Sequence, residues 1–267
     1  MRPVRKVKLL VSFTLALAAT TSMAFIFISI TVVGRGDLLE ALLEGPLDAA
    51  DPRLLYLVRE RYLVAPASAP YNLKEDYMLP VDQSYLSYRN SSLGWEKLHL
   101  LVVTLFDHQP PGFFVEAGAL DGEYLSNTLY LERNKNWTGL LVEPDAEMFK
   151  YMLEKNRKAW TSHSCLATTN YPSKVMLYGC VEEEVAQAFW GSTVTVDVWL
   201  VEHHNPYSSN DTYDDTFIKI FEIQGYSVYT IITELQPFNY VFIRQNSTLH
   251  DAAFAIRPSE FDFKHGI

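Results

Sequence analysis

A chain of 267 residues, of which 48% are hydrophobic, has room for one domain of ordinary size with additional segments. Its formal net charge of −10 and the lack of a basic face argue against nucleic acid as a partner. Only two cysteines occur, Cys165 and Cys180, which excludes a fold held together by a disulfide framework.

The N-terminal segment predicts a membrane anchor. Residues 1–8 form a basic tail, and residues 9–33, Leu9 to Val33, follow without a charge. This run is long enough for the roughly 20 residues of a membrane-spanning helix and exceeds the core of about 7–15 residues of a cleaved signal peptide. Small residues within it leave cleavage open as an alternative. Because the basic charge precedes the span, we expect a type II topology with a cytosolic N-terminus and a luminal or extracellular domain.

Four N-glycosylation sequons agree with a luminal domain, and they begin at Asn90, Asn136, Asn210 and Asn246. In that compartment a disulfide between Cys165 and Cys180 is chemically permitted, and two free buried thiols are the alternative.

Residues 34–92 are predicted to form a luminal stem. Asp37 to Glu44 is a short helix candidate, and Asp51 followed by Pro52 is a good N-cap and first position for a helix that continues to Tyr62. The stretch Ala65 to Tyr71 is rich in Pro, Ala and Ser, which is typical of a linker.

The domain is expected to begin at residue 93, with a helix that ends before Pro110-Pro111-Gly112. Its apolar residues recur at i, i+3, i+4, i+7 and i+8, and these are Leu98, Leu101, Val102, Leu105 and Phe106. A strand over Phe113–Val115, a helix within Ser126–Arg133 and a strand over Leu140–Val142 follow. This order predicts a βαβ unit and therefore a parallel sheet in an α/β fold.

Two acids and two glycines of this unit predict a ligand site. Glu116 and Glu143 each follow a predicted strand, so both lie at the carboxyl edge of the sheet, where α/β folds bind ligands. Gly118 and Gly122 allow backbone N–H groups to approach a ligand closely. An acid after the second strand can accept hydrogen bonds from ribose hydroxyls. The pattern indicates a nucleoside-type site, and the alternative is a turn whose glycines only relieve backbone strain.

The remainder of the domain continues the alternation of helices and strands. We expect inward-facing Met148, Phe149, Met152 and Leu153 on a helix over Asp145–Arg157, and a buried central strand over Thr193–Val201. The other expected elements are a third strand at His163–Ala167 or Val175–Tyr178, a helix over Thr216–Gln224 ended by Gly225, and a closing pair of strands at Tyr226–Ile231 and Tyr240–Arg244. The tail, residues 250–267, shows no firm periodicity.

The run VEAGALDGEYLSNTLYLE, with WTGLLVEPD and EKNRKAW after it, resembles the FkbM family of S-adenosylmethionine methyltransferases and, more closely, the Star family. The resemblance implies a Rossmann-like methyltransferase-type domain over residues 93–249. It further implies a type II protein of the endoplasmic reticulum and Golgi that escorts membrane-tethered EGF-family ligand precursors.

One family motif is missing from the chain. The Asp-x-Glu-Gly-x-Glu phrase of these families does not occur, and only 12 residues separate Cys180 from Thr193. A strand with its crossover helix does not fit into that length. We therefore expect an incomplete parallel sheet that lacks an inner strand.

Three functions follow from these features. The favoured hypothesis is a Star-like trafficking protein with no catalytic residue, no metal and no cofactor. The alternative is a methyltransferase in which Glu116, Gly118 and Gly122 hold the methionine end of S-adenosylmethionine and Glu143 holds its ribose, although Asp121 places a negative charge near the cofactor's carboxylate. The acids Asp211, Asp214 and Asp215 suggest a glycosyltransferase only superficially, and His203 and His204 are given no role.

Overall fold

The computed structural model describes residues 48, 50–74, 93–166, 194–203, 213–233 and 237–256. The predicted anchor Leu9–Val33, the helix candidate Asp37–Glu44 and the alternative third strand Val175–Tyr178 lie outside these residues. Within the described ranges, no helix has both the length and the apolar character needed to cross a membrane.

The described chain belongs to two compact units, and the boundary lies between Leu57 and Val58. Helix α2, Pro52–Leu57, is in the first unit and buries Leu54 and Leu57. Asp51 precedes it, and its Oδ1 accepts the Arg53 amide at 2.8 Å, as the predicted N-cap requires. The chain enters the second unit as a π-helical turn η1, Val58–Tyr62. The expected domain start at residue 93 therefore differs from the division into units.

The second unit contains a four-stranded sheet in the order β1-β4-β3-β2. Strands β2 (Phe113–Ala117), β3 (Thr138–Val142) and β4 (Trp160–Ser162) are parallel, and β1 (Leu63–Val64) joins β4 antiparallel. Helices α4 (Leu129–Lys135) and α5 (Ala146–Glu154) form the two crossovers. The predicted βαβ unit is confirmed. The first predicted position of the third strand, His163–Ala167, is wrong, because β4 ends at Ser162.

Helix α5 differs from its prediction on one side. Met152 is buried in a small core with Phe114, Leu141 and Ala159, and Phe149 packs against that core. Leu153, which was expected to face inward, is exposed. The shorter helix explains the difference, since α5 ends at Glu154 and needs only one narrow apolar face.

A second sheet has the order β5-β7-β6 and is antiparallel throughout. It consists of β5 (Val198–His203), β6 (Tyr226–Ile232) and β7 (Phe238–Arg244), with α7 (Asp215–Ile223) before β6. The closing strand pair and the helix ended by Gly225 are confirmed. The buried central strand over Thr193–Val201 is wrong: β5 is an edge strand of this sheet, and Val198, Trp199 and Leu200 are only half-buried.

The single sheet that the sequence predicted is therefore wrong for the described residues, although the α/β class is confirmed. The strand corresponding to Thr193–Val201 was expected next to β2 and β3, but it belongs to the other sheet. Within the described ranges, no strand pairs with the second edge of β2. Residues 167–193, to which the prediction of a missing inner strand applies, lie outside the described residues, so that part stays a prediction.

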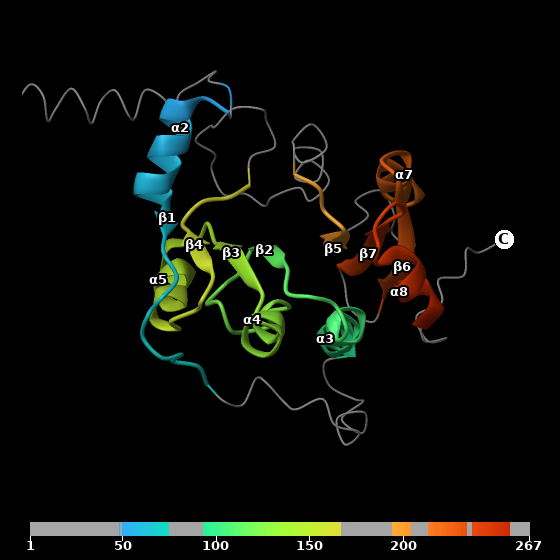
Figure 1. Ribbon diagram of the computed structural model, residues 1–267, viewed down its shortest axis with the longest axis horizontal. Coiled ribbons are helices and arrows are strands. Elements are labelled where there is room, and N and C mark those ends of the chain that lie inside the picture. Colours follow the sequence, from blue (N-terminus) through green and yellow to red (C-terminus); the bar gives the residue numbers. More distant parts are fainter. Residues whose placement is uncertain are drawn as a thin grey trace, which may run out of the picture. The chain divides into compact units, whose positions relative to one another are not determined.

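Helix α3 (Leu93–Phe106) contacts both α4 and the second sheet (Figure 1). Its predicted apolar face is confirmed, because Leu98, Leu101, Val102, Leu105 and Phe106 are all buried. They share one core with Leu131 of α4, residues of β6 and β7, and Ala253 of α8 (His250–Ile256). Helix α8 lies in the tail where no periodicity was found.

Residues Leu63 to Asn72, here called the strap, lie along the first sheet. The Ala67 amide donates to the Arg157 carbonyl at 3.1 Å, and the Asn72 amide donates to the Lys155 carbonyl at 3.0 Å. Lys158 Nζ donates to the Ala67 carbonyl at 2.9 Å and also to that of Ala69. The stretch Ala65–Tyr71, expected to be a linker, is thus anchored although it has little regular structure.

Candidate functional site

Glu116 and Glu143 lie at the carboxyl ends of neighbouring parallel strands, as the sequence predicted. Glu116 is the fourth residue of β2 and pairs in register with Leu141, and Glu143 directly follows β3. The chain between β2 and α4, residues Gly118 to Thr128, is here called the edge loop. It begins at this same edge of the sheet.

Glu116 binds the end of the edge loop. Its Oε2 accepts hydrogen bonds from Ser126 Oγ at 2.8 Å and Thr128 Oγ1 at 2.5 Å, and its Oε1 accepts the Asn127 amide at 3.1 Å. Thr128 is the N-cap of α4 but makes no side-chain cap bond; its hydroxyl donates to Glu116 instead of accepting a helix amide. Glu116 therefore fixes the loop where α4 begins.

Glu143 is buried and binds the start of the edge loop. Its Oε2 accepts the Leu120 amide at 2.7 Å, and its Oε1 accepts the Asp145 amide at 2.7 Å. Leu120 has φ +49°, which is unusual for a residue with a side chain. A carboxylate oxygen can accept two hydrogen bonds, so each oxygen of Glu143 keeps capacity for another donor.

The two glycines of the edge loop have different surroundings. Gly118 has φ +73°, and a Cβ added there would meet nothing within 4 Å. Gly122 has φ +76°, and a Cβ there would lie 2.7 Å from Met152 Cγ. Gly122 is thus needed for packing against α5, whereas Gly118 leaves open space beside the strand end.

The backbone amides of the edge loop are largely engaged within the protein. Those of Gly118 and Ala119 donate to the Val142 carbonyl, at 2.9 and 3.1 Å, and that of Gly122 donates to the Ala119 carbonyl. Asp121 Oδ1 accepts the next two amides, those of Glu123 and Tyr124. In contrast to the expectation from the glycines, these N–H groups do not point toward an anionic ligand.

Asp121 is balanced by Lys155, a residue that the sequence analysis did not single out. Lys155 Nζ lies 2.5 Å from Glu123 Oε2 and 3.3 Å from Asp121 Oδ2. Burial alone would raise the pKa of Asp121, but the amides of Tyr124 and Glu123 and the charge of Lys155 lower it. The expected repulsion between Asp121 and a ligand carboxylate is reduced by this cation.

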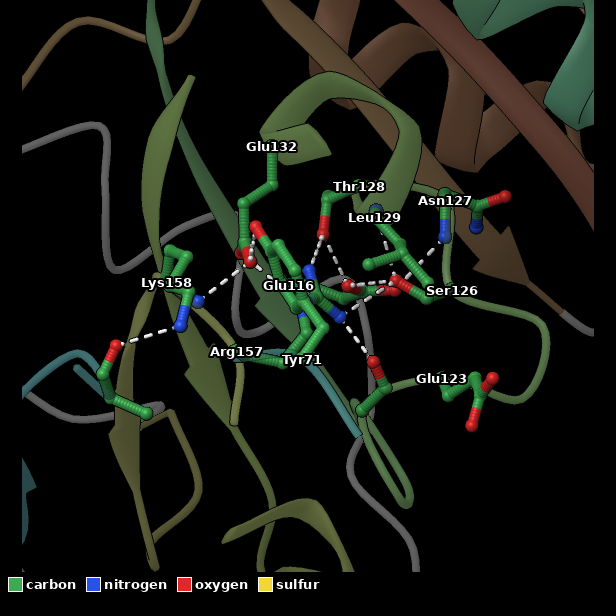
Figure 2. A network of polar contacts seen from close by, with 12 residues as sticks. Tyr71, Glu116, Glu123, Ser126, Asn127, Thr128, Leu129, Glu132, Arg157 and Lys158 are labelled. Atoms are coloured by element: carbon green, nitrogen blue, oxygen red, sulfur yellow. Dashed lines mark hydrogen bonds and ion pairs between the residues drawn. The ribbon is translucent and has the colours of Figure 1, made fainter. Parts of the chain in front are cut away.

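Arg157 is the second residue that sequence reasoning missed, and its guanidinium is buried in the middle of a polar network (Figure 2). Its Nε donates to Glu132 Oε2 at 3.1 Å. Its Nη1 donates to the Gly122 carbonyl and to Ser126 Oγ at 3.3 Å, and its Nη2 donates to Thr128 Oγ1 at 3.3 Å. The only signal in the sequence was the phrase EKNRKAW, which supported the family resemblance without indicating these partners.

Glu132 completes this network on the side of the strap. Its Oε1 accepts the Tyr71 hydroxyl at 3.0 Å and the Lys158 amide at 2.6 Å. Burial and the nearby Glu132 carboxylate raise the pKa of Tyr71, so this phenol remains a donor at neutral pH. Lys158 Nζ also lies 4.8 Å from the centre of the Tyr71 ring.

His203 and the aspartate cluster lie apart from the edge loop in the sequence and in their contacts. His203 Nε2 is 3.1 Å from Asp214 Oδ2, and its ring stacks on Phe217. Asp214 is the N-cap of α7 through the amides of Thr216 and Phe217. No group of three potential metal ligands occurs within the described ranges, which leave out His204 and Asp211.

The remaining predicted sites are described only in part. Asn136 is exposed in a left-handed conformation after α4, and Asn246 is exposed after β7. Both positions are accessible, as a glycan requires. Cys165 is half-buried. Asn90, Asn210 and Cys180 are outside the described residues, so the sequons there and the disulfide stay predictions.

No protein-family model and no curated protein matches the chain. Among solved structures, it is similar to the human methyltransferase 10 domain containing protein, with 13% identity and a TM-score of 0.37 over 72% of this chain and 93% of that chain. It is also similar to the hMettl16 catalytic domain in complex with the MAT2A 3'UTR hairpin 6, with 11% identity and a TM-score of 0.36 over 76% of this chain and 84% of that chain. The mixed α/β class of the fold rests on the chain's own strands and helices.

Two expectations need correction. The exclusion of nucleic acid as a partner, drawn from the net charge, is wrong, and the second structure is itself a complex with a 3'UTR hairpin. A net charge of −10 sums the whole chain and does not describe a local surface. Neither structure is a Star protein, so the resemblance to Star rests on the sequence phrases alone.

Proposed function

We propose that the second unit is a methyltransferase-like domain that binds S-adenosylmethionine at the carboxyl edge of β2 and β3. The observation that carries this proposal is that the carboxyl ends of the parallel strands β2 and β3 lie next to each other. Gly118 leaves open space after β2, and the carboxylate of Glu143 follows β3. Ligands of α/β folds bind at this edge, and an acid in this position serves the ribose.

The nucleoside half of the cofactor fits the described residues better than its amino-acid half. Glu143 has one acceptor position left on each oxygen, which suits two ribose hydroxyls. The amides of Gly118 and Ala119 are bonded to Val142, so they offer nothing to a carboxylate. When bound, S-adenosylmethionine supplies an activated methyl group.

We propose that this site binds the cofactor, and we assign no catalytic step to it. Glu116 holds three donors of the edge loop, and Glu143 holds two backbone amides. Neither is placed as a general base, and no other described residue of this edge takes that part. We therefore assign the chain's residues to holding the ligand, and methyl transfer to none of them.

Isothermal titration of the full chain with S-adenosylmethionine tests the proposal. Gly118→Ala adds a Cβ to the open space, and we expect it to weaken binding at least about 10-fold. Gly225→Ala is the matched control, because Gly225 also has a positive φ with nothing near its Cβ, and it lies after α7. Absence of saturable binding to the wild type, or equal losses in both variants, would refute the site.

A second experiment assigns Glu143 to the ribose. Glu143→Gln and a 2′-deoxy analogue of the cofactor form a double cycle with the wild type. Hydrogen bonds to a charged group contribute about 1.5–3 kcal/mol, so each single change should cost about 10- to 100-fold in affinity. The two losses should not add, because both remove the same hydrogen bond. Additive losses would place the ribose elsewhere.

A non-catalytic trafficking protein of Star type is the second candidate. The specific observation in its favour is the internal bonding of the loop amides, which a binding domain tolerates better than an enzyme does. The type II topology in the endoplasmic reticulum and Golgi belongs to this candidate. A protein that resists carbonate extraction, loses mass on endoglycosidase treatment and transfers no labelled methyl group would favour it.

A further inference from the structure

We propose that Arg157 is a positioning residue for the edge loop, and that the strap, through Tyr71, is a working part of the same site. The identity of the ligand, S-adenosylmethionine, rests on the proposed function. The coupling between the strap and the edge loop does not depend on it. Three segments far apart in sequence meet at Arg157: the strap, the edge loop and α4.

The guanidinium holds the edge loop at several points. It donates to the carbonyl of Gly122 and to the hydroxyls of Ser126 and Thr128. The planar fork of an arginine fixes these acceptors relative to each other, which a lysine cannot do. The loop has positive φ at two residues with side chains, Leu120 and Leu125, a conformation that persists only when surrounding contacts hold it.

Two hydroxyls of the network each donate one hydrogen bond and accept another. Ser126 and Thr128 each give their only hydroxyl proton to Glu116, so their oxygens are left to accept from Arg157. Each hydroxyl thus lies between a cation and a carboxylate. Such chains polarise one another inside a protein and are stronger than separate bonds.

Glu132 ties this arrangement to the strap. Its two oxygens divide between Arg157 Nε on one side and Tyr71 with the Lys158 amide on the other. Arg157 and Glu132 are both nearly inaccessible, with side-chain exposures of 0% and 1%. When a buried carboxylate loses one hydrogen-bond donor, the strength and geometry of its bonds to the remaining donors change. Losing the Tyr71 bond therefore alters how Glu132 holds Arg157.

The strap backbone is attached at Arg157 and at Lys155, two residues before it. Ala67 donates to the carbonyl of Arg157 itself, and Asn72 donates to that of Lys155. Release of the strap would therefore free the backbone of Arg157 as well as the carboxylate that orients its side chain. We infer that a docked strap is required for the edge loop to keep its ligand-ready shape.

Hydrogen exchange of the ligand-free full chain tests the coupling with Tyr71→Phe, which removes one hydroxyl and keeps the ring. Useful reporters are the amides of Leu120, Asn127 and Leu129, which depend on the loop's side-chain acceptors. We expect their exchange to rise at least about 3-fold, with β6 and β7 unchanged. The matched control is Tyr151→Phe, which removes a similar hydroxyl bond to Glu147 on the exposed face of α5.

Faster exchange confined to the strap, or a uniform rise over the whole unit, would overturn the inference. The second variant, Arg157→Lys, should accelerate exchange of the same three amides and weaken S-adenosylmethionine binding about 10-fold. The unfolding midpoint of Tyr71→Phe should stay unchanged. Failure of the wild type to bind the cofactor would remove the proposed function and leave the exchange result standing. Unchanged exchange in both variants would remove the positioning role, whatever the affinity.

Discussion

At the scale of single residues, Gly118 and Gly122 share a backbone conformation but differ in their neighbours. An alanine at positive φ costs about 1–2 kcal/mol, and Gly118→Ala should lose no more than that. Gly122→Ala must also displace Met152, so we expect a further loss of about 1–3 kcal/mol. Urea unfolding of the two variants measures the difference, and equal losses would mean that Met152 adapts without strain.

The pair of His203 and Asp214 predicts a specific response to acid. Burial alone would raise the pKa of Asp214, but hydrogen bonds from His203 and from the amides of Phe217 and Thr216 lower it below the usual 3.8. A lowered pKa in the folded state contributes stability above pH 3.8 that is lost as the pH falls through the folded value.

Asp214→Asn should remove this contribution while keeping an acceptor for the helix amides. The stability difference between wild type and variant should be largest above pH 3.8 and shrink in more acidic solution. Chemical unfolding between pH 2 and 6 measures it. A difference that stays constant across this range would show that the charge of Asp214 contributes nothing.

The sequence could place Glu116 and Glu143, because each follows an apolar run and strand ends are visible locally. It could not place Arg157 or Tyr71. Their partners lie 25 and 61 positions away in the chain, and nothing in the spacing of a lone arginine or tyrosine specifies such contacts. Nor could a glycine pattern show that the loop amides are donated to Val142 and Asp121 rather than to a ligand.

At the scale of elements, α7 has one face in the core of the second sheet. Phe221 stacks on Phe242 with ring centres 4.0 Å apart, and it has no exposed surface. Phe221→Ala should cost about 3–5 kcal/mol, because a cavity replaces the ring. Ile223→Ala on the same helix is the control, since Ile223 is 80% exposed and should change stability by less than about 0.5 kcal/mol. Thermal or urea unfolding compares the two.

Elements with their own periodicity were predictable and those defined by contacts were not. Helices α3 and α7 repeat apolar residues with a helical period, and both were found. Helix α8 is short, and among its residues only Ala253 is buried, so its sequence carries little pattern. The strap resembles a linker because its bonds to Arg157 and Lys155 use the backbone, which composition does not reveal.

At the scale of the whole second unit, α3 shares one core with α4 of the first sheet and with strands of the second. Leu101 is 1% exposed in that core, so Leu101→Ala should cost about 2–5 kcal/mol. Because α4 and the second sheet both pack on this helix, exchange protection should fall in α4 and in β7 together. Protection lost on one side only would show that α4 and the second sheet unfold independently.

The division into two sheets could be foreseen only in part. The number of residues before Thr193 predicted that an inner strand is missing. That number does not tell which of the remaining strands belong to which sheet. The antiparallel pairing of β5 with β7 decides that question, since β7 takes β5 into the second sheet. Pairing of this kind depends on contacts between residues as far apart in the chain as Val198 and Ile243, and neither strand alone specifies it.

The strap also has a mechanical consequence. It follows η1 at the start of the second unit, so tension applied from the N-terminal side would load η1, β1 and the strap before the rest of that unit. The bonds of Lys158 to two strap carbonyls and the backbone bonds at Ala67 and Asn72 would share that load. Once they yielded, Tyr71 would lose its bond to Glu132, and the tension would reach the edge loop through that carboxylate.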